Sequence, residues 1–523
     1  YYTGFAMGHD EAEHLSALFS LERGEVPYRD FLENHPLLFH IALGSLKNLF
    51  QLSSGVEAYW LGKSLVFAHF ALCILTLVGM SARVFRRENR PTKVWALAAI
   101  ALVMPDWWLR SLWTITIWEL RPDWICYAYA LLAIVIHYDW HARSIEERDP
   151  RLRNGPMLIA GAAAGLSTAI LFKSIYLFLP YALSLAFITI DRYRYIAYRL
   201  RNRWRQVLIA NFFFLVSGFF FLSIFVFFEL KATGATFAEY WAANVSLNSI
   251  KHILDSPVLT NDLSPFNVAK EMLGIGLIIF IVILIGSSLR LAILARNKLS
   301  HEYFLLYFII LTVVLNLSLP AFSNGLSWPH YLIPTVIVTI IFFIIILQRL
   351  FEFFSLSGPA AKRMLVVRLL VLLLPFSLIL AVFSIRFTTA IILNENLSAP
   401  DRILGRVAKS VFATHFVAES DLPINATYLT FRPVAKPVEA KAWGYYYMLY
   451  SDKGFWLDNY RLGLGPDPRT YWATLFKSTP PDIIDLKGHY DFTAKEIVIG
   501  RSQGVDIGWL WPIVTTDYIC LSK

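Results

Sequence analysis

The sequence predicts a polytopic, mainly α-helical membrane protein that carries a mixed α/β domain at its C-terminal end. Of the 523 residues, 57% are hydrophobic and only 16% are charged, and the mean hydropathy is +0.53. A soluble globular protein has about 45–50% apolar and about 25% charged residues. This apolar excess excludes an ordinary cytosolic enzyme and a disordered chain. Three cysteines are also too few for a disulfide-stapled domain.

Apolar runs long enough to approach the length of a spanning helix recur along the first three quarters of the chain. A span needs roughly 17–25 apolar residues, because the hydrocarbon layer is about 30 Å thick. We expect ten spans, at 58–80, 93–106, 122–139, 155–172, 174–190, 207–229, 268–289, 302–319, 330–348 and 365–386. The shorter run 36–50 contains Lys47 and Asn48, so we interpret it as a helix in the outer membrane interface.

The loops between these spans alternate in charge. Arginine and lysine gather in the loops at 81–93, 143–153, 192–205, 290–298 and 349–363, which all fall on one side of the membrane if the ten spans are correct. The positive-inside rule makes that side the cytoplasm. The net charge of +9 therefore reflects topology, because a nucleic-acid-binding patch would not alternate with the spans.

Three domains follow from this topology. Residues 1–57 form an acidic extracytoplasmic segment, residues 58–386 form the transmembrane domain, and residues 387–523 form a soluble extracytoplasmic domain. The last has strand-like runs at 426–431 and 497–499 and a helical run near 400–413. Because the sequence opens in an outer segment without an initiator Met, we expect that a first span precedes it. The predicted localisation is a bacterial inner membrane.

Candidate catalytic groups begin in the first outer segment. Its first helix is expected to end at Gly24, and Asp10, Glu13 and His14 share one face of it. Asp10 and Glu13 also have the spacing of a capping box, which needs no catalytic role. His9, Asp10 and His14 lack a diagnostic metal-ligand spacing. No cofactor or metal is predicted, although a divalent ion is compatible with these residue types.

Further charged residues lie at the predicted outer ends of spans. The loop 106–123 holds four tryptophans typical of interfacial anchors, together with Arg110, Glu119, Arg121 and Asp123. For Glu119, Arg121 and Asp123, a structural ion pair and a substrate contact are equally open. Lys63, Lys173 and the His330–Tyr331 pair lie at the same depth. Lysines there usually snorkel or pair, yet a cluster of cations at headgroup level also suits a lipid phosphate.

Several short motifs resemble the GT-C superfamily of membrane glycosyltransferases. They are Asp10-Glu11, Leu21-Glu22-Arg23-Gly24, Pro27-Tyr28-Arg29-Asp30-Phe31, Asn34-His35-Pro36-Leu37-Leu38, Gly62-Lys63-Ser64-Leu65, Arg121-Pro122-Asp123, Phe172-Lys173 and His330-Tyr331-Leu332-Ile333-Pro334. The pattern is similar to the group of protein O-mannosyltransferases, lipid A aminoarabinose transferases and lipopolysaccharide sugar transferases. It covers most of the membrane part, whereas the soluble tail matches only loosely.

This resemblance implies an enzyme that takes a sugar from a polyprenyl-phosphate donor. It implies Asp10 as the general base on an acceptor hydroxyl, with Glu11 as its neighbour. Lys63, Lys173, His330 and His35 would hold the donor phosphate, and Arg110, Glu119, Arg121, Asp123 and Tyr331 would contact substrate. Relatives often carry Lys where this chain has His35 and Arg where it has Lys63. In-line attack with one base and no covalent intermediate would invert the anomeric centre.

Other classes remain open from the sequence. A lipid or glycan transporter or flippase would show repeat symmetry and charges near mid-span, whereas the charges here gather in outer loops. A non-catalytic lipid-binding subunit would keep its function without Asp10. An O-antigen polymerase or ligase would use a diphosphate-linked glycan donor. The acceptor, whether lipopolysaccharide, another cell-envelope glycan, a lipid or a protein, is not indicated by the sequence.

Overall fold

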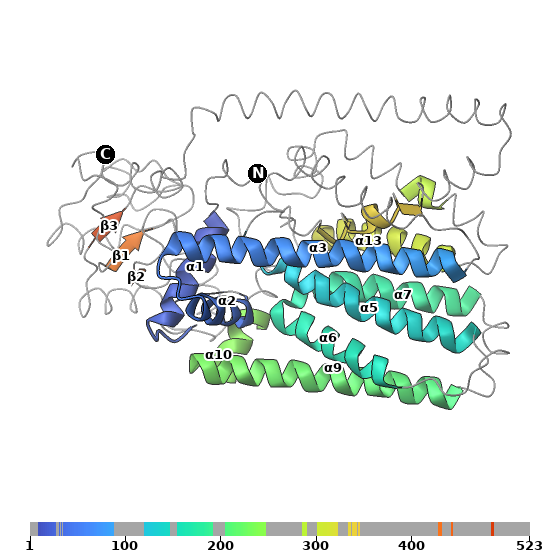
Figure 1. The fold of residues 1–523 in the computed structure, drawn as a ribbon, viewed down its shortest axis with the longest axis horizontal. Helices are drawn as coiled ribbons and strands as arrows, with labels where there is room; N and C mark the ends of the chain where they lie inside the picture. The colour runs from blue at the N-terminus through green and yellow to red at the C-terminus, as the bar shows by residue number, and fades with distance from the viewer. Residues whose placement is uncertain are drawn as a thin grey trace, which may run out of the picture.

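The computed structural model shows a long helical bundle with short helices and a small sheet at one end (Figure 1). It describes residues 9–27, 31, 33, 35–87, 120–146, 154–191, 204–246, 285–289, 301–322, 333–335, 337–342, 344–345, 427–430, 441–442 and 483–485. Some of these, including 9, 10 and the strand residues, are described in backbone only. The predicted spans 93–106 and 365–386 lie outside these residues, as do most of 268–289 and part of 330–348.

The helices of the bundle match the remaining predicted spans. They are α3 (Gly55–Arg87), α5 (Asp123–Glu146), α6 (Gly155–Ile170), α7 (Ile175–Asp191), α9 (Trp204–Thr233) and α13 (His301–Phe322). Among the described residues, the helical stretches 57–84, 172–189 and 204–233 are long and apolar enough to cross a membrane. With 33 residues, α3 is about 50 Å long, which exceeds the hydrocarbon thickness of about 30 Å. The protein is a mainly helical membrane protein.

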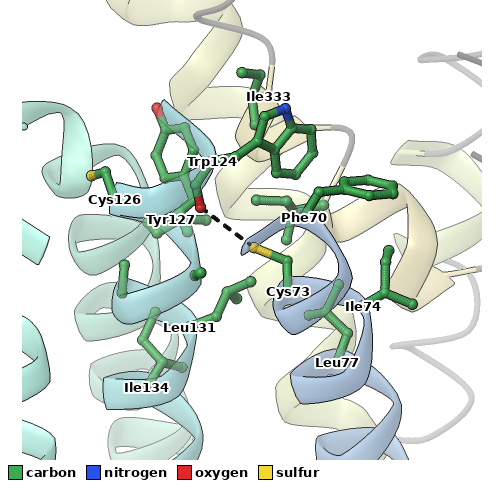
Figure 2. Close-up of a cluster of buried hydrophobic side chains, with 14 of the residues drawn as sticks. Phe70, Cys73, Ile74, Leu77, Trp124, Cys126, Tyr127, Leu131, Ile134 and Ile333 are labelled. Carbon is green, nitrogen blue, oxygen red and sulfur yellow. Dashed lines mark hydrogen bonds between the residues drawn. The ribbon is translucent and has the colours of Figure 1, made fainter. Parts of the chain in front are cut away.

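The core of the bundle lies between α3, α5, α7 and α13. Phe70, Cys73, Ile74 and Leu77 of α3 face Trp124, Tyr127 and Leu131 of α5 (Figure 2). The Cys73 thiol donates to the Trp124 carbonyl at 3.8 Å, and the Trp124 and Phe70 rings meet edge to face at 4.8 Å. This packing holds the first turn of α5 against α3.

A glycine seam brings α6 close to α9. A Cβ atom on Gly161 or Gly165 would collide with the backbone of Phe214 or Gly218. Small residues allow helix backbones to approach closely in a membrane. The opposite face of α9 exposes large apolar side chains, among them Phe212, Phe219 and Phe227, as expected for a face that contacts lipid.

Two shorter helices lie across the end of the bundle where α3 and α5 begin (Figure 1). They are α1 (His9–Glu22) and α2 (Leu38–Leu49), and α2 falls in the run 36–50 expected to be an interfacial helix. As predicted, Gly24 terminates α1: it follows the last helical residue, Glu22, by two positions and has a φ of +79°. The Gly24 amide donates to the Leu21 carbonyl and the Glu25 amide to the Ser20 carbonyl, which is a Schellman motif.

The same end holds two short helical turns after α9, which are α10 (Phe237–Trp241) and the π turn η2 (Ala242–Ser246). The 3-10 turn η1 (Phe172–Ser174) joins α6 to α7. A capping box starts α3: the Glu57 amide donates to the Ser54 hydroxyl, while the Ser53 and Ser54 amides donate to the Glu57 carboxylate. The chain therefore turns at defined residues on this side of the bundle.

Three strands of the C-terminal region form a parallel sheet with the order β2-β1-β3. They are β1 (Thr427–Thr430), β2 (Lys441–Ala442) and β3 (Ile483–Asp485), and β1 lies in the predicted strand-like run 426–431. The predicted runs 400–413 and 497–499 lie outside the described residues. Because β2 contacts α1, these strands lie at the α1 end of the bundle (Figure 1).

The predicted topology can be tested by labelling a cysteine at each end of the bundle. Ser45 is exposed on α2, and Arg83 is exposed near the far end of α3. In a Cys520→Ser background, where Cys73 and Cys126 are buried, we expect Ser45→Cys to react with an impermeant maleimide in intact spheroplasts. Arg83→Cys should react only after the membrane is opened. The reverse pattern would overturn the topology.

Candidate functional site

A cluster of charged and imidazole side chains lies at the α1 end of the bundle. It draws on the beginning of α3, the beginning of α5, the turn η1 and the outer segment with α1 and α2. We call it the end cluster; its described members are Glu11, His14, Glu33, His35, His40, Lys63, Arg121, Asp123 and Lys173. Most of these side chains are buried, so each charge needs a partner.

Asp123 is held by two cations. The Lys173 Nζ donates to its Oδ1 at 3.1 Å, and the Arg121 Nε donates to its Oδ2 at 3.1 Å. Asp123 opens α5, where the helix dipole favours a carboxylate, and Lys173 reaches it from η1 because the chain turns there between α6 and α7. Two cations against one carboxylate give this trio a formal charge of +1.

Glu11 ties α1 to the bundle. Its carboxylate forms an ion pair with Lys63 of α3 and accepts a hydrogen bond from the Leu120 amide at 2.9 Å. The Lys63 Nζ also lies over the Tyr59 ring, 5.1 Å from its centroid. Gly62 allows this approach, because a Cβ there would collide with the Leu120 side chain. Glu11 and Lys63 thus hold α1 in place at the beginning of α5.

Glu33 lies among three histidines. The His35 Nδ1 donates to its Oε1 at 2.7 Å, while the His14 Nδ1 and the His40 Nε2 each lie 3.6 Å from its Oε2. The His14 Nδ1 and the His40 Nε2 are themselves 3.1 Å apart. His14 comes from α1 and His40 from α2, so the Glu33 carboxylate lies where these two helices meet.

Burial and charge separate the pKa values of these groups. Burial lowers the pKa of His40 to about 3. Burial also lowers the pKa of His35, because it outweighs the opposing effect of the Glu33 carboxylate, which would raise that pKa. Burial also opposes the charged form of His14, but the adjacent Glu33 raises its pKa on balance. Desolvation would raise the pKa of Glu33, yet the adjacent imidazoles of His14 and His35 hold it well below its usual range.

The two halves of the end cluster act on each other electrostatically. The positive charge of Lys173 contributes to the lowered pKa of His35, and the negative charge of Asp123 contributes to the raised pKa of His14. A ligand that binds near Lys173 would therefore change the field at the histidines, since unshielded charges interact strongly in buried surroundings.

A buried carboxylate of α9 also contributes to this end of the bundle. Glu229, near the end of α9, accepts a hydrogen bond from the Leu37 amide at 2.8 Å, and both groups are buried. The first amides of a helix have no partner within it, and this carboxylate supplies one at the beginning of α2. It anchors the segment that carries Glu33 and His40.

The structure brings together six of the predicted site residues, namely Glu11, His35, Lys63, Arg121, Asp123 and Lys173. Asp10 lies in the first turn of α1, next to Glu11, and its side chain is outside the description. Arg110, Glu119, His330 and Tyr331 also lie outside the described residues. Their roles stay predictions.

Sequence reasoning did not single out Glu33, His40 or Glu229. His40 and Glu229 are polar residues inside apolar runs, and a polar group in such a run is a signal that it has a partner or a function. Glu33 carries no comparable signal, because it is one of several acids in the outer segment. Only the folded arrangement shows that Glu33 is the most enclosed of the acids whose side chains the structure describes there, at 0% exposure.

Comparison with known proteins adds one likeness in structure. No model of a protein family matches the sequence, and no curated protein matches it. The structure is similar to ArnT from Cupriavidus metallidurans bound to undecaprenyl phosphate, with a TM-score of 0.51 over 90% of this chain and 86% of that one. The chain has a GT-C fold. At 11% sequence identity, the likeness establishes the fold expected from the sequence motifs and leaves the roles of individual residues to the chemistry of the site.

Proposed function

We propose that this protein transfers a sugar from a polyprenyl-phosphate donor to a hydroxyl group of an extracytoplasmic acceptor, such as lipopolysaccharide or another lipid-linked glycan. The observation that carries the proposal is the Lys173–Asp123–Arg121 trio, which concentrates two cations at the end of the bundle in a GT-C fold. The structural neighbour was solved with undecaprenyl phosphate bound, and a lipid phosphate lies at the depth where such cations gather.

Each step of the proposed reaction has a residue for it. Asp10 takes the proton of the acceptor hydroxyl as that oxygen attacks the anomeric carbon, which can accelerate the reaction about 10²–10⁴-fold. The bond from that carbon to the lipid phosphate oxygen breaks, and the phosphate leaves with the electron pair. Lys173 and Arg121 stabilise the developing negative charge, and Lys63 and His35 of the end cluster add to the positive charge that holds the phosphate. A single in-line displacement of this kind inverts the anomeric centre.

The experiment that tests this function starts from the donor. The full-length protein is reconstituted in liposomes with a radiolabelled polyprenyl-phosphate sugar and lipopolysaccharide, and mass spectrometry of co-purifying lipid identifies which sugar to supply. We expect label to move to the acceptor with release of polyprenyl phosphate. Movement of intact donor across the bilayer without transfer would identify a transporter, and dependence on a diphosphate-linked glycan would identify a polymerase or ligase.

Lys173→Ala should weaken donor binding more than it slows turnover. A hydrogen bond to a charged group contributes about 1.5–3 kcal/mol, so the apparent donor KM should rise roughly 10–100-fold. The rate at saturating donor should stay within about threefold, and Lys173→Arg should recover most of the affinity because it keeps the charge. Initial rates over a range of donor concentrations measure both constants.

Lys231→Ala provides the matched control for Lys173→Ala. Lys231 is an exposed cation near the end of α9, where its Nζ lies 5.7 Å from the Phe227 ring centroid. The substitution therefore removes the same charge as Lys173→Ala but outside the end cluster. Its donor KM should equal that of the wild type. An unchanged donor KM for Lys173→Ala would reduce Lys173 to a structural partner of Asp123.

A further inference from the structure

Three metal-ligating atoms converge on one point at the junction of α1 and α2. The His14 Nδ1, the His40 Nε2 and the Glu33 Oε2 lie at the corners of a triangle with sides of 3.1, 3.6 and 3.6 Å. Ligands about 2.0–2.1 Å from a tetrahedral zinc ion lie about 3.3–3.4 Å from one another. The triangle therefore has the dimensions of one face of a zinc coordination tetrahedron.

The arrangement is poorly satisfied by protons alone. Each of the three atoms can offer a lone pair to a metal ion, and the side chains are 2%, 0% and 0% exposed for His14, Glu33 and His40. One proton between His14 and His40 satisfies that pair, yet the Glu33 Oε2 accepts no hydrogen bond within the described structure. A buried carboxylate oxygen without a partner is costly. A single cation at the centre of the triangle would satisfy all three atoms at once.

The surroundings fit a metal site in a second respect. The other oxygen of Glu33 is already held, because the His35 Nδ1 donates to Oε1 at 2.7 Å and the His35 amide at 3.2 Å. Contacts of this kind orient metal-binding carboxylates, and here they leave Oε2 pointing toward the two imidazoles. Two imidazoles and a carboxylate form a ligand set that suits zinc.

We propose that His14, Glu33 and His40 bind one zinc ion, which fastens α1, the segment before α2, and α2 to one another. Three protein ligands leave the fourth position to a water molecule or another oxygen ligand, as in zinc sites that remain open. The ligands come from three separate segments, so their spacing along the chain does not indicate the site. This inference does not depend on the proposed transferase activity.

Zinc content tests the site directly. The full-length protein is purified in detergent, incubated with Zn²⁺ and passed over a desalting column. We expect mass spectrometry to find about one zinc ion per chain. Glu33→Gln and His40→Gln keep the size of each side chain but remove a ligand, and each should lower zinc affinity by more than about 100-fold. His35→Asn perturbs only the orientation of Glu33 and should lower it about 10–100-fold.

His69→Gln is the matched control, because His69 lies on α3 with its Nδ1 bonded to the Leu65 carbonyl and takes no part in the cluster. It should bind zinc as the wild type does. X-ray absorption of the wild-type protein gives a measurement that needs no variant, and we expect two imidazoles in the first shell. The site would be overturned if the wild type contained no zinc, or if its spectrum showed no imidazole ligand. It would also be overturned if Glu33→Gln and His40→Gln bound as much zinc as the wild type.

Thermal stability supplies an independent readout. A chelator should lower the melting temperature of the wild type and of His69→Gln, and it should leave that of His40→Gln unchanged, because a ligand that binds only the folded state stabilises it. Equal chelator effects on all three proteins would contradict the proposal. A protein that binds zinc but transfers no sugar would retain this site and lose the proposed function, so the two failures are distinguishable.

Discussion

Asp10→Asn should abolish most sugar transfer while the protein still folds and binds donor. If Asp10 removes the acceptor proton, its loss should lower turnover by about 10²–10⁴-fold. Asparagine is nearly the size of aspartate and caps a helix about as well, so a purely structural Asp10 would leave near-normal activity in this variant. Turnover at saturating donor, normalised to folded protein, distinguishes the two roles.

Two further acids of α1 act as comparisons for Asp10. Glu13→Gln changes a neighbouring carboxylate and should keep wild-type turnover. Glu11→Gln disrupts the ion pair with Lys63, so we expect a lower yield of folded protein, with turnover of the folded fraction within about tenfold of the wild type if proton transfer stays with Asp10. A fully active Asp10→Asn enzyme would instead place the base at Glu11 or Glu119.

Asp123→Asn should cause the largest loss of stability among the substitutions in the end cluster. It leaves Lys173 and Arg121 buried without their shared carboxylate, and removing one partner of a buried ion pair typically costs about 3–5 kcal/mol. The free energy of unfolding from titration with a denaturing detergent measures the effect.

A second substitution in the same trio provides the decisive comparison for Asp123. Adding Lys173→Met to Asp123→Asn removes one of the two buried cations that lose the Asp123 carboxylate, so the double variant should be more stable than Asp123→Asn alone. Non-additivity of this kind is expected for groups in contact or in one ion-pair network, and Lys173→Met alone completes the comparison. A double variant less stable than the single one would mean that water or lipid headgroups solvate these cations.

The helices and the depth of the site could be predicted from the sequence. Hydropathy and the basic loops place Lys63, Asp123 and Lys173 near one end of their spans, which is why the prediction brought them together. The C-terminal end of α1 was also predictable, because Gly24 adopts the positive φ that a Schellman motif requires.

The partners within the site could not be predicted in the same way. Hydropathy gives the position of a residue along a helix but not the neighbours it meets around it, so the pairing of Glu11 with Lys63 was not evident. The Glu33–His14–His40 contact depends on how α1 and α2 cross, and no local pattern encodes that crossing. Asp10, by contrast, was predicted to be the general base from its resemblance to a family motif, and not from any feature of its spacing.

The hydrogen bond from Leu37 to Glu229 has a consequence for the order in which the protein is assembled. The two residues are 192 positions apart, so the ribosome delivers α2 long before α9 exists. Until α9 is inserted, the Leu37 amide at the beginning of α2 lacks the Glu229 carboxylate that accepts its hydrogen bond. The segment that bears Glu33 and His40 then has no anchor on that side. The site therefore matures late in biogenesis, and nascent chains halted before α9 should expose this segment to protease while completed chains protect it.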